Sequence, residues 1–223
     1  MSLDLLLRHH ARVGGDPQAL AVVTRSLDAM AAGGIHDHLG GGFARYSVDR
    51  QWLVPHFEKM LYDQALLARV YLHAWQVTGL PRYRAVLDDI VGYVLRDLRD
   101  PSGSFHAAED ADSEGVEGKF YVWTDDEIRA VLGDDAAVVL DWWGVGPGGN
   151  FEGATILNRL HGQPDDAEPP EIDEARRRLL AVREERVRPG RDDKVLTEWN
   201  ALMIAVLAEA GAATGTTAWV DAA

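Results

Sequence analysis

Apolar positions recur along this chain at the spacing of α-helices. The first clear stripe places apolar residues at intervals of three and four: Leu20, Val23, Leu27 and Met30. It follows Asp16-Pro17, a pair in which the aspartate suits the N-cap and the proline suits the first helical position. Gly33-Gly34 ends the pattern, as glycine often does just past a helix. The pattern predicts a helix that begins at Pro17.

Two further helices differ in how many of their faces are apolar. The segment from about Phe57 to Thr78 is apolar nearly all the way round, and its polar stripe is short: Arg69, His73 and Gln76. A helix of this kind packs on several sides. The next segment starts at Pro81 and has one apolar stripe opposite a charged face: Tyr83, Leu87, Ile90, Val94 and Leu98. The two patterns indicate an inner helix beside an outer helix.

The rest of the chain repeats this alternation of helices and short extended segments. Thr124 and Glu127 form a capping box that opens a short helix. Further helices are predicted over residues 135–143, 171–186 and 197–214, and another starts at residue 216 or 217. Strand-like segments occupy residues 43–54 and 103–123. A glycine-rich loop over 144–153 and a connector rich in Pro and Asp over 163–170 complete the series.

These elements predict an all-α fold with short β-hairpins in its loops. The helices come in pairs of unequal polarity, with a period of about 40 residues that lies in the range of helical repeats. Pairs of inner and outer helices are typical of an α/α toroid. The absence of a strict sequence repeat makes a solenoid the less favoured alternative. We treat residues 1–223 as a single domain.

Composition narrows the classes of function. The chain of 223 residues is 47% apolar and 26% charged, which is ordinary for a globular protein. Its formal net charge of −14 argues against nucleic acid and anionic membranes as partners. The absence of Cys excludes disulfides, thiolate nucleophiles and Cys-ligated zinc. No run approaches the ~20 apolar residues of a membrane span, and no signal peptide is evident. We expect a cytoplasmic protein without a cofactor or a metal.

The most informative stretch is residues 33–64, GGIHDHLGGGFARYSVDRQWLVPHFEKMLYDQ. It concentrates histidine, acidic, basic and aromatic residues between two helical segments. Such a composition is typical of a surface that holds a polar ligand.

This stretch and three others resemble the spermatogenesis-associated protein 20 family. The other three are EDADSEGVEGKFYVWT (residues 109–124), GNFEGATILN (149–158) and RPGRDDKVLTEWNALM (188–203), in the order that the family has them. The resemblance implies a thioredoxin-like domain followed by an (α/α)6 barrel similar to N-acylglucosamine 2-epimerases and other six-hairpin sugar enzymes. The resemblance supports a prediction of the fold more strongly than a prediction of any particular reaction.

The chain also departs from the family pattern. The thioredoxin-like domain and the remaining helical hairpins are absent, so the chain is expected to form roughly the first half of the barrel. Ala44 stands where relatives are expected to have His, and His36 where they are expected to have Tyr. An incomplete central site leads us to expect little or no activity from this chain alone.

The strongest candidate for catalysis is His56. With residues 57–78 predicted as a helix, positions 56, 59 and 63 share one face. His56 could transfer protons at a sugar carbon or hydroxyl, with Glu58 or Asp63 as its carboxylate partner. The alternative is structural: Glu58 favours the helix N-terminus, and Lys59 forms a local ion pair with Asp63.

A second acidic motif starts like a calcium loop. Asp110, Asp112 and Glu114 are spaced as D-x-D-x-E, but the twelfth position is Tyr121, which excludes an EF-hand. Asp110 and Asp112 could serve as paired carboxylates of the glycosidase type. The alternative is a turn in which Asp side chains bond to their own backbone.

Other residues are candidates for substrate binding. The set comprises Arg45, Tyr46, Lys59, Asp193, Trp199 and Asn200. Aromatic rings stack on the apolar faces of sugars, and the polar groups bond to their hydroxyls. The alternative for the last three is helix capping and core packing.

We therefore expect an incomplete toroid of the carbohydrate-active type that binds a sugar or polyol in a central cavity. Complete relatives would carry out epimerase, isomerase or glycosidase-like chemistry. The alternative is a non-catalytic binding module that works with a thioredoxin-like domain. Apolar helix faces left uncovered by an incomplete ring predict a homodimer.

Overall fold

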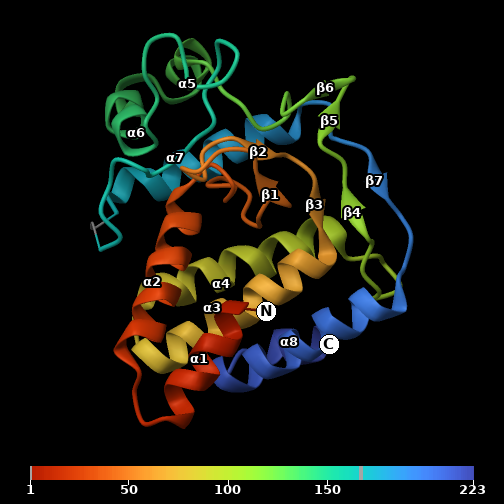
Figure 1. Ribbon diagram of the computed structural model, residues 1–223. Coiled ribbons are helices and arrows are strands. Elements are labelled where there is room, and N and C mark those ends of the chain that lie inside the picture. The colour runs from red at the N-terminus through yellow and green to blue at the C-terminus, as the bar shows by residue number, and fades with distance from the viewer. Residues whose placement is uncertain (1, 166–167) are drawn as a thin grey trace. The chain divides into compact units, whose positions relative to one another are not determined.

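The computed structural model shows a mostly α-helical protein with short β-hairpins, as the sequence predicts (Figure 1). It describes residues 2–165 and 168–223. The chain divides into two compact units. The first comprises Met1–Asp28, Lys59–Glu109 and Arg191–Ala223, and the second comprises Ala29–Glu58 and Asp110–Gly190. The prediction of one incomplete toroidal domain is not tested by this division.

The first unit is built around one central helix. α3 (Leu61–Thr78) packs against α1 (Ser2–Arg12), α4 (Pro81–Tyr93) and α8 (Thr197–Thr214), which lie beside it in Figure 1. α9 (Thr217–Ala222) packs on α8. Neighbours on several sides explain why α3 is apolar on most faces. The helix α1 has no counterpart among the predicted elements.

The predicted helix after Asp16 is confirmed as α2 (Pro17–Ala32). The Asp16 carboxylate accepts hydrogen bonds from the backbone N–H groups of Gln18 (2.9 Å) and Ala19 (3.2 Å), as an N-cap does. Val23 and Leu27 of the apolar stripe are fully buried.

The stripe of the third predicted helix is also buried along its whole length: Tyr83, Leu87, Ile90, Val94 and Leu98. The regular α-helix α4 ends at Tyr93, and a π-helical turn, η1 (Val94–Leu98), carries the stripe to its end. One wider turn therefore completes the apolar face without breaking it.

The prediction that the long helix starts at Phe57 is wrong. Lys59–Met60 form a strand, β3, which pairs antiparallel with β4 (Ala108–Glu109), and β4 pairs with β7 (Arg191–Asp192). Lys59 lies opposite Glu109 in this register. The backbone hydrogen bonds of the strand replace those of a first helical turn. Residues 56, 59 and 63 therefore do not share a helical face.

The second unit combines two hairpins with three helices. β1 (Tyr46–Ser47) pairs with β2 (Pro55–His56), and β5 (Asp112–Ser113) pairs with β6 (Val116–Glu117). The helices α5 (Asp125–Leu132), α6 (Ala136–Trp142) and α7 (Pro170–Glu184) pack on one another, and a 3-10 turn, η2 (Gly133–Asp135), joins the first two. Their core is rich in large side chains: Trp123, Ile128, Val139, Trp143 and Leu179.

The local sequence signals for helix starts in the second unit agree with the structure. The predicted capping box is confirmed: Thr124 Oγ1 accepts from the N–H of Glu127, and the Glu127 carboxylate accepts from the N–H of Thr124. α7 begins at Pro170. The connector predicted over 163–170 includes residues 166–167, which lie outside the described residues. No helix in the described part of the chain is long and apolar enough to span a membrane.

A buried ion pair fixes the glycine-rich segment of the second unit. Arg183 of α7 donates two hydrogen bonds to the Asp37 carboxylate (2.8 and 2.9 Å), and these side chains are 3% and 7% exposed. The Arg183 guanidinium also lies over the rings of Phe120 and Tyr121. The Asp37 carboxylate in turn accepts from the N–H groups of residues 39 and 40. One charge pair thus joins α7 to the start of the Gly40–Gly42 segment.

Replacing Arg183 by Met should lower the free energy of unfolding by about 3–5 kcal/mol, because it leaves the Asp37 carboxylate buried without its cation. Chemical denaturation followed by circular dichroism measures the change. The control is Arg177→Met on the same helix, whose side chain is 73% exposed and whose loss should cost about 0.5 kcal/mol or less. Equal costs for the two variants would contradict the proposed importance of the pair.

Candidate functional site

Four of the predicted site residues come together in the second unit. Arg45, Tyr46, His56 and Glu58 lie on or beside the β1–β2 hairpin. The register pairs Tyr46 with His56, and their rings stack with centroids 5.0 Å apart and an interplanar angle of 24°. The stack limits rotation of the imidazole. Strand pairing, and not a shared helical face, therefore brings Tyr46 and His56 together.

Glu117, a residue that the sequence analysis did not single out, completes the cluster. Its carboxylate lies 2.7 Å from His56 Nδ1 and accepts a hydrogen bond from the backbone N–H of Phe57 (3.3 Å). Because a carboxylate can only accept, the facing Nδ1 must carry the proton. In the neutral ring the lone pair is therefore on Nε2, the atom available for proton transfer.

The other side of the imidazole faces Glu58. His56 Nε2 lies 3.5 Å from Glu58 Oε2, and Arg45 donates to the same oxygen at 2.9 Å. The N–H of Arg45 also donates to the carbonyl oxygen of Glu58 (2.8 Å). The side chains of His56, Glu58 and Arg45 remain 28%, 25% and 44% exposed. Solvent, and hence a small ligand, can reach the cluster.

A second carboxylate shapes the hairpin that carries His56. Asp49 lies between β1 and β2 and accepts hydrogen bonds from the backbone N–H groups of Gln51, Leu53 and Val54. Burial by itself would raise the pKa of Asp49, but these backbone donors outweigh it and hold the pKa below its ordinary value. The ionised side chain therefore organises the turn, including Trp52 in its unusual left-handed conformation (φ 66°).

The β5–β6 hairpin, which carries Glu117, closes with the two-residue turn Glu114–Gly115. Glu114 and Gly115 both have positive φ (53° and 75°), as type I′ turns require. This turn sets Asp112 opposite Glu117. Directly after Glu117 the chain passes close to the aromatic core, because Gly118 (φ 76°) lies against the ring of Phe57. Phe57 also stacks on Tyr121, with centroids 5.6 Å apart.

Asp110 and Asp112 belong to this hairpin and are exposed. Asp110 Oδ1 accepts from the N–H groups of Ala111 (2.6 Å) and Asp112 (3.3 Å), which is the local bonding of the turn alternative. Their roles as catalytic carboxylates stay predictions. The carboxylate of this hairpin that contacts His56 belongs to Glu117.

The remaining candidates lie in the first unit. Lys59 is 2% exposed, and its ammonium lies 4.3 Å from the centroid of the Tyr93 ring. The Tyr93 hydroxyl donates to Glu109, the strand partner of Lys59. Asp63 lies in the first turn of α3, where a negative charge is favourable. The Lys59 side chain thus contacts groups of the protein itself, which favours a structural role. Ligand binding by Lys59 and by Asp63 stays a prediction.

The side-chain amide of Asn200 forms three hydrogen bonds with backbone groups. Its Oδ1 accepts from the N–H of Phe105 (2.8 Å), and its Nδ2 donates to the carbonyl oxygens of Phe105 (2.9 Å) and Leu196 (3.1 Å). These bonds use both amide donors and favour a structural role. A contact of Asn200 with a ligand stays a prediction.

Trp199 and Asp193 are more accessible. Trp199 packs edge to face on Tyr62, with centroids 4.9 Å apart. Asp193 is 66% exposed and accepts from Arg191 at 2.6 Å. It also lies 3.6 Å from His106, a buried histidine that the sequence analysis did not select. Their predicted roles in substrate binding are likewise untested.

The two positions that depart from the family pattern are buried. His36 stacks on Phe43 with centroids 4.8 Å apart, and Ala44 is 5% exposed. Nearby His38 is also buried, which lowers its pKa to about 4, although the Gly33 carbonyl oxygen opposes this shift. His36 and His38 therefore belong to the packed interior of the second unit.

Gly118→Ala tests whether Glu117 depends on the contact with Phe57. A Cβ at position 118 would lie 2.5 Å from the Phe57 ring, whereas one at Gly115 would meet nothing within 4 Å. Both positions have similar positive φ, which costs about 1–2 kcal/mol for Ala. We expect Gly118→Ala to cost about 1–3 kcal/mol more than Gly115→Ala in chemical denaturation. Equal costs would show that the Phe57 contact is unimportant.

Comparison with known proteins identifies related sequences. No family model matches the chain. Spermatogenesis-associated protein 20 of Mus musculus is 37% identical over 237 residues, which cover 91% of the chain and 30% of the mouse protein. The Homo sapiens protein of the same name is 36% identical, with the same two coverages. An uncharacterized protein of Caenorhabditis elegans is 34% identical over 99% of the chain and 35% of its own length.

These matches cover nearly all of the chain and agree with the resemblance carried by the four quoted motifs. The chain spans about a third of the length of the curated relatives that it matches. A thioredoxin-like domain and a six-hairpin barrel in complete relatives stay predictions. The chain itself belongs to the spermatogenesis-associated protein 20 family.

Proposed function

We propose that the cluster around His56 binds a sugar or polyol and that His56 exchanges a proton with it. The contact that carries this proposal is the 2.7 Å bond between His56 Nδ1 and Glu117. A carboxylate at Nδ1 orients the imidazole, fixes the proton on that side and stabilises the imidazolium once Nε2 takes a proton. This is the arrangement that general acid–base catalysis needs.

Epimerisation or isomerisation is the reaction class that the cluster suits best. The Nε2 lone pair would take the proton from a carbon next to the sugar carbonyl. The electron pair of the C–H bond would form the C=C bond of an enediolate, and the π pair of the carbonyl would move onto its oxygen. Return of the proton to the former carbonyl carbon, with transfer of the neighbouring hydroxyl proton to the enediolate oxygen, gives the isomer, whereas delivery of a proton to the opposite face of the original carbon gives the epimer. Nothing is oxidised or reduced overall. Because Glu58 lies on the Nε2 side, its charge also favours the imidazolium formed in the first step.

Arg45 and Tyr46 would bind the substrate in this scheme. Arg45 is anchored through Glu58 but keeps part of its guanidinium exposed, and Tyr46 is 48% exposed. An arginine donates to hydroxyl and carbonyl oxygens, while an aromatic ring packs on the apolar face of a sugar. We further propose an α/α toroid in complete relatives, a role in carbohydrate metabolism, and a cytoplasmic location.

The experiment is titration of the protein with a panel of monosaccharides and polyols by isothermal calorimetry, followed by NMR detection of any conversion. We expect at least one binder with a dissociation constant of about 1 mM or tighter. If it is converted, His56→Gln should lower kcat by about 10²–10⁴-fold, the usual contribution of a general acid or base. Glu117→Gln should lower kcat in the same direction, because it removes the charge that stabilises the imidazolium.

The matched control is His9→Gln, which changes a histidine that is 51% exposed in the first unit and pairs with Asp16. It should leave binding and turnover unchanged. Binding without conversion would contradict the catalytic role and favour the non-catalytic binding module. Hydrolysis of a glycoside in place of isomerisation would contradict the reaction class. Absence of binding across the panel would contradict the proposal as a whole.

We also propose that the chain forms a homodimer through exposed apolar helix positions. On α8, Ala201, Ile204, Ala205 and Ala208 are exposed at intervals of one, three and four, so they share one face. An apolar face of this kind gains free energy when a second copy covers it.

Light scattering at micromolar concentration should therefore report a dimer, and Ile204→Glu should shift it to a monomer, because a charge in the contact would lose its hydration. The control is Val138→Glu on α6, a helical side chain that is 42% exposed against 43% for Ile204. A monomeric parent protein, or a dimer that survives Ile204→Glu, would refute the α8 interface.

A further inference from the structure

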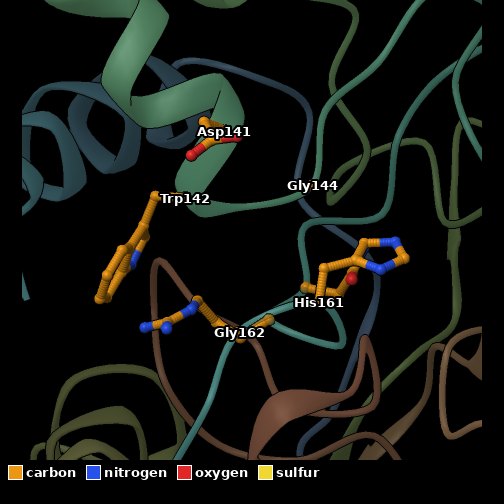
Figure 2. Close-up of a pocket in the computed structure, with 7 residues that line it drawn as sticks. Asp141, Trp142, Gly144, His161 and Gly162 are labelled. Carbon is orange, nitrogen blue, oxygen red and sulfur yellow. The ribbon is translucent and has the colours of Figure 1, made fainter. Parts of the chain in front are cut away.

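The second unit contains a pocket that the chemistry of His56 does not use. Its volume is about 410 Å³, within the range of small-molecule sites. Figure 2 shows its two sides: Asp141 and Trp142 come from the end of α6, and His161 and Gly162 come from a facing loop. Asn158 and Arg159, at the start of this loop, also line it.

The loop side of the pocket is held in place by close contacts. Asn158 is 4% exposed, donates to the Ile156 carbonyl oxygen (3.0 Å) and accepts from the N–H of Leu160 (3.2 Å). Gly162 lies so close to the Arg159 guanidinium that a Cβ there would collide with it. The loop is therefore a preformed wall, which lowers the entropic cost of binding a ligand.

The positive charge of the pocket is fixed on an aromatic ring. The Arg159 guanidinium lies 3.3 Å from the centroid of the Trp142 ring. Stacking uses the face of the guanidinium, whereas its five N–H groups point outward in its plane. An arginine held in this way can donate two parallel bonds to a carboxylate and still keep another partner.

The negative charge of the pocket comes from Asp141. Within residues 2–165 and 168–223, the Asp141 carboxylate makes no hydrogen bond or ion pair. Other carboxylates of this unit are paired with cations, as Asp37, Glu58 and Glu127 show. Asp141 thus offers an acceptor for a donor that comes from outside the chain.

We propose that this pocket binds a small zwitterion with an ammonium and a carboxylate, as a free amino acid has. Arg159 would take the carboxylate, Asp141 would take the ammonium, and the exposed ring of His161 would border the side chain. A simple anion would be repelled by Asp141, and a simple cation by Arg159. Only a ligand that carries both charges can form favourable ion pairs with both Arg159 and Asp141. The proposal is independent of the sugar site at His56.

The test is a panel of the free L-amino acids, examined by saturation-transfer NMR and then singly by calorimetry. At least one should bind with a dissociation constant of about 1 mM or tighter. The best binder is then compared with its hydroxy-acid and amine analogues, as alanine is with lactate and ethylamine. Each analogue lacks one charge and should bind at least about tenfold more weakly.

Two variants assign the binding to this pocket. Asp141→Asn keeps the shape of the side chain and should weaken binding about tenfold, because the ammonium loses its charged acceptor. Its matched control is Asp134→Asn, an exposed aspartate of η2 that should leave binding unchanged. Arg159→Gln should weaken binding as strongly. If that variant fails to fold, Asp141→Asn and the analogue series decide the question.

Three outcomes would overturn the proposal. The first is that no amino acid binds more tightly than about 10 mM. The second is that lactate and ethylamine bind as well as alanine. The third is that Asp141→Asn binds like Asp134→Asn, which would place any binding elsewhere. A loss of sugar binding in His56→Gln with amino-acid binding intact would show that the two sites are separate.

Discussion

The second unit depends on the buried pair between Arg183 and Asp37. A guanidinium and a carboxylate that are both nearly inaccessible to water must bond to each other, because either charge alone would be too costly to bury. The pair therefore fixes the distance between α7 and the glycine-rich segment. Through the backbone bonds of Asp37, it also fixes the start of the chain that leads to Arg45 and Tyr46.

The His56 cluster is a product of two hairpins that are far apart in the sequence. β2 contributes His56 and β6 contributes Glu117, 61 residues later. Each hairpin is ordered by local chemistry: the Asp49 carboxylate in one, and the positive φ angles of residues 114 and 115 in the other. Because each partner is positioned by its own strand, the imidazole and the carboxylate are held in place before a ligand arrives.

The proposed sites of the second unit use charge in different ways. At His56 the charges are paired with one another, and the lone pair of Nε2 is the reactive group that we propose. In the pocket beside α6, the Asp141 carboxylate has no partner among the described residues, and the Arg159 guanidinium is fixed on Trp142. The first arrangement suits the transfer of a proton, and the second suits recognition of a ligand by its own charges.

Local sequence determined most of the helices. The N-cap at Asp16, the capping box at Thr124 and the stripe from Tyr83 to Leu98 each act over a few residues, so the sequence alone predicts them. The segments Arg45–Tyr46 and His56–Glu58 were also recognisable as candidates from their composition. The prediction that residues 56, 59 and 63 share a helical face was wrong, because Lys59 and Met60 form β3 and the helix starts only at Leu61.

Tertiary structure decided the rest. Residues 57–60 have no strong local preference, and pairing with Ala108–Glu109 of β4 makes Lys59 and Met60 a strand. The partner of His56 could not be chosen from Glu114, Glu117 and the nearby aspartates by spacing, because the choice depends on how two distant hairpins meet. Sequence fixes interactions within a turn or two of the chain, whereas contacts across 61 residues exist only once the whole unit has packed.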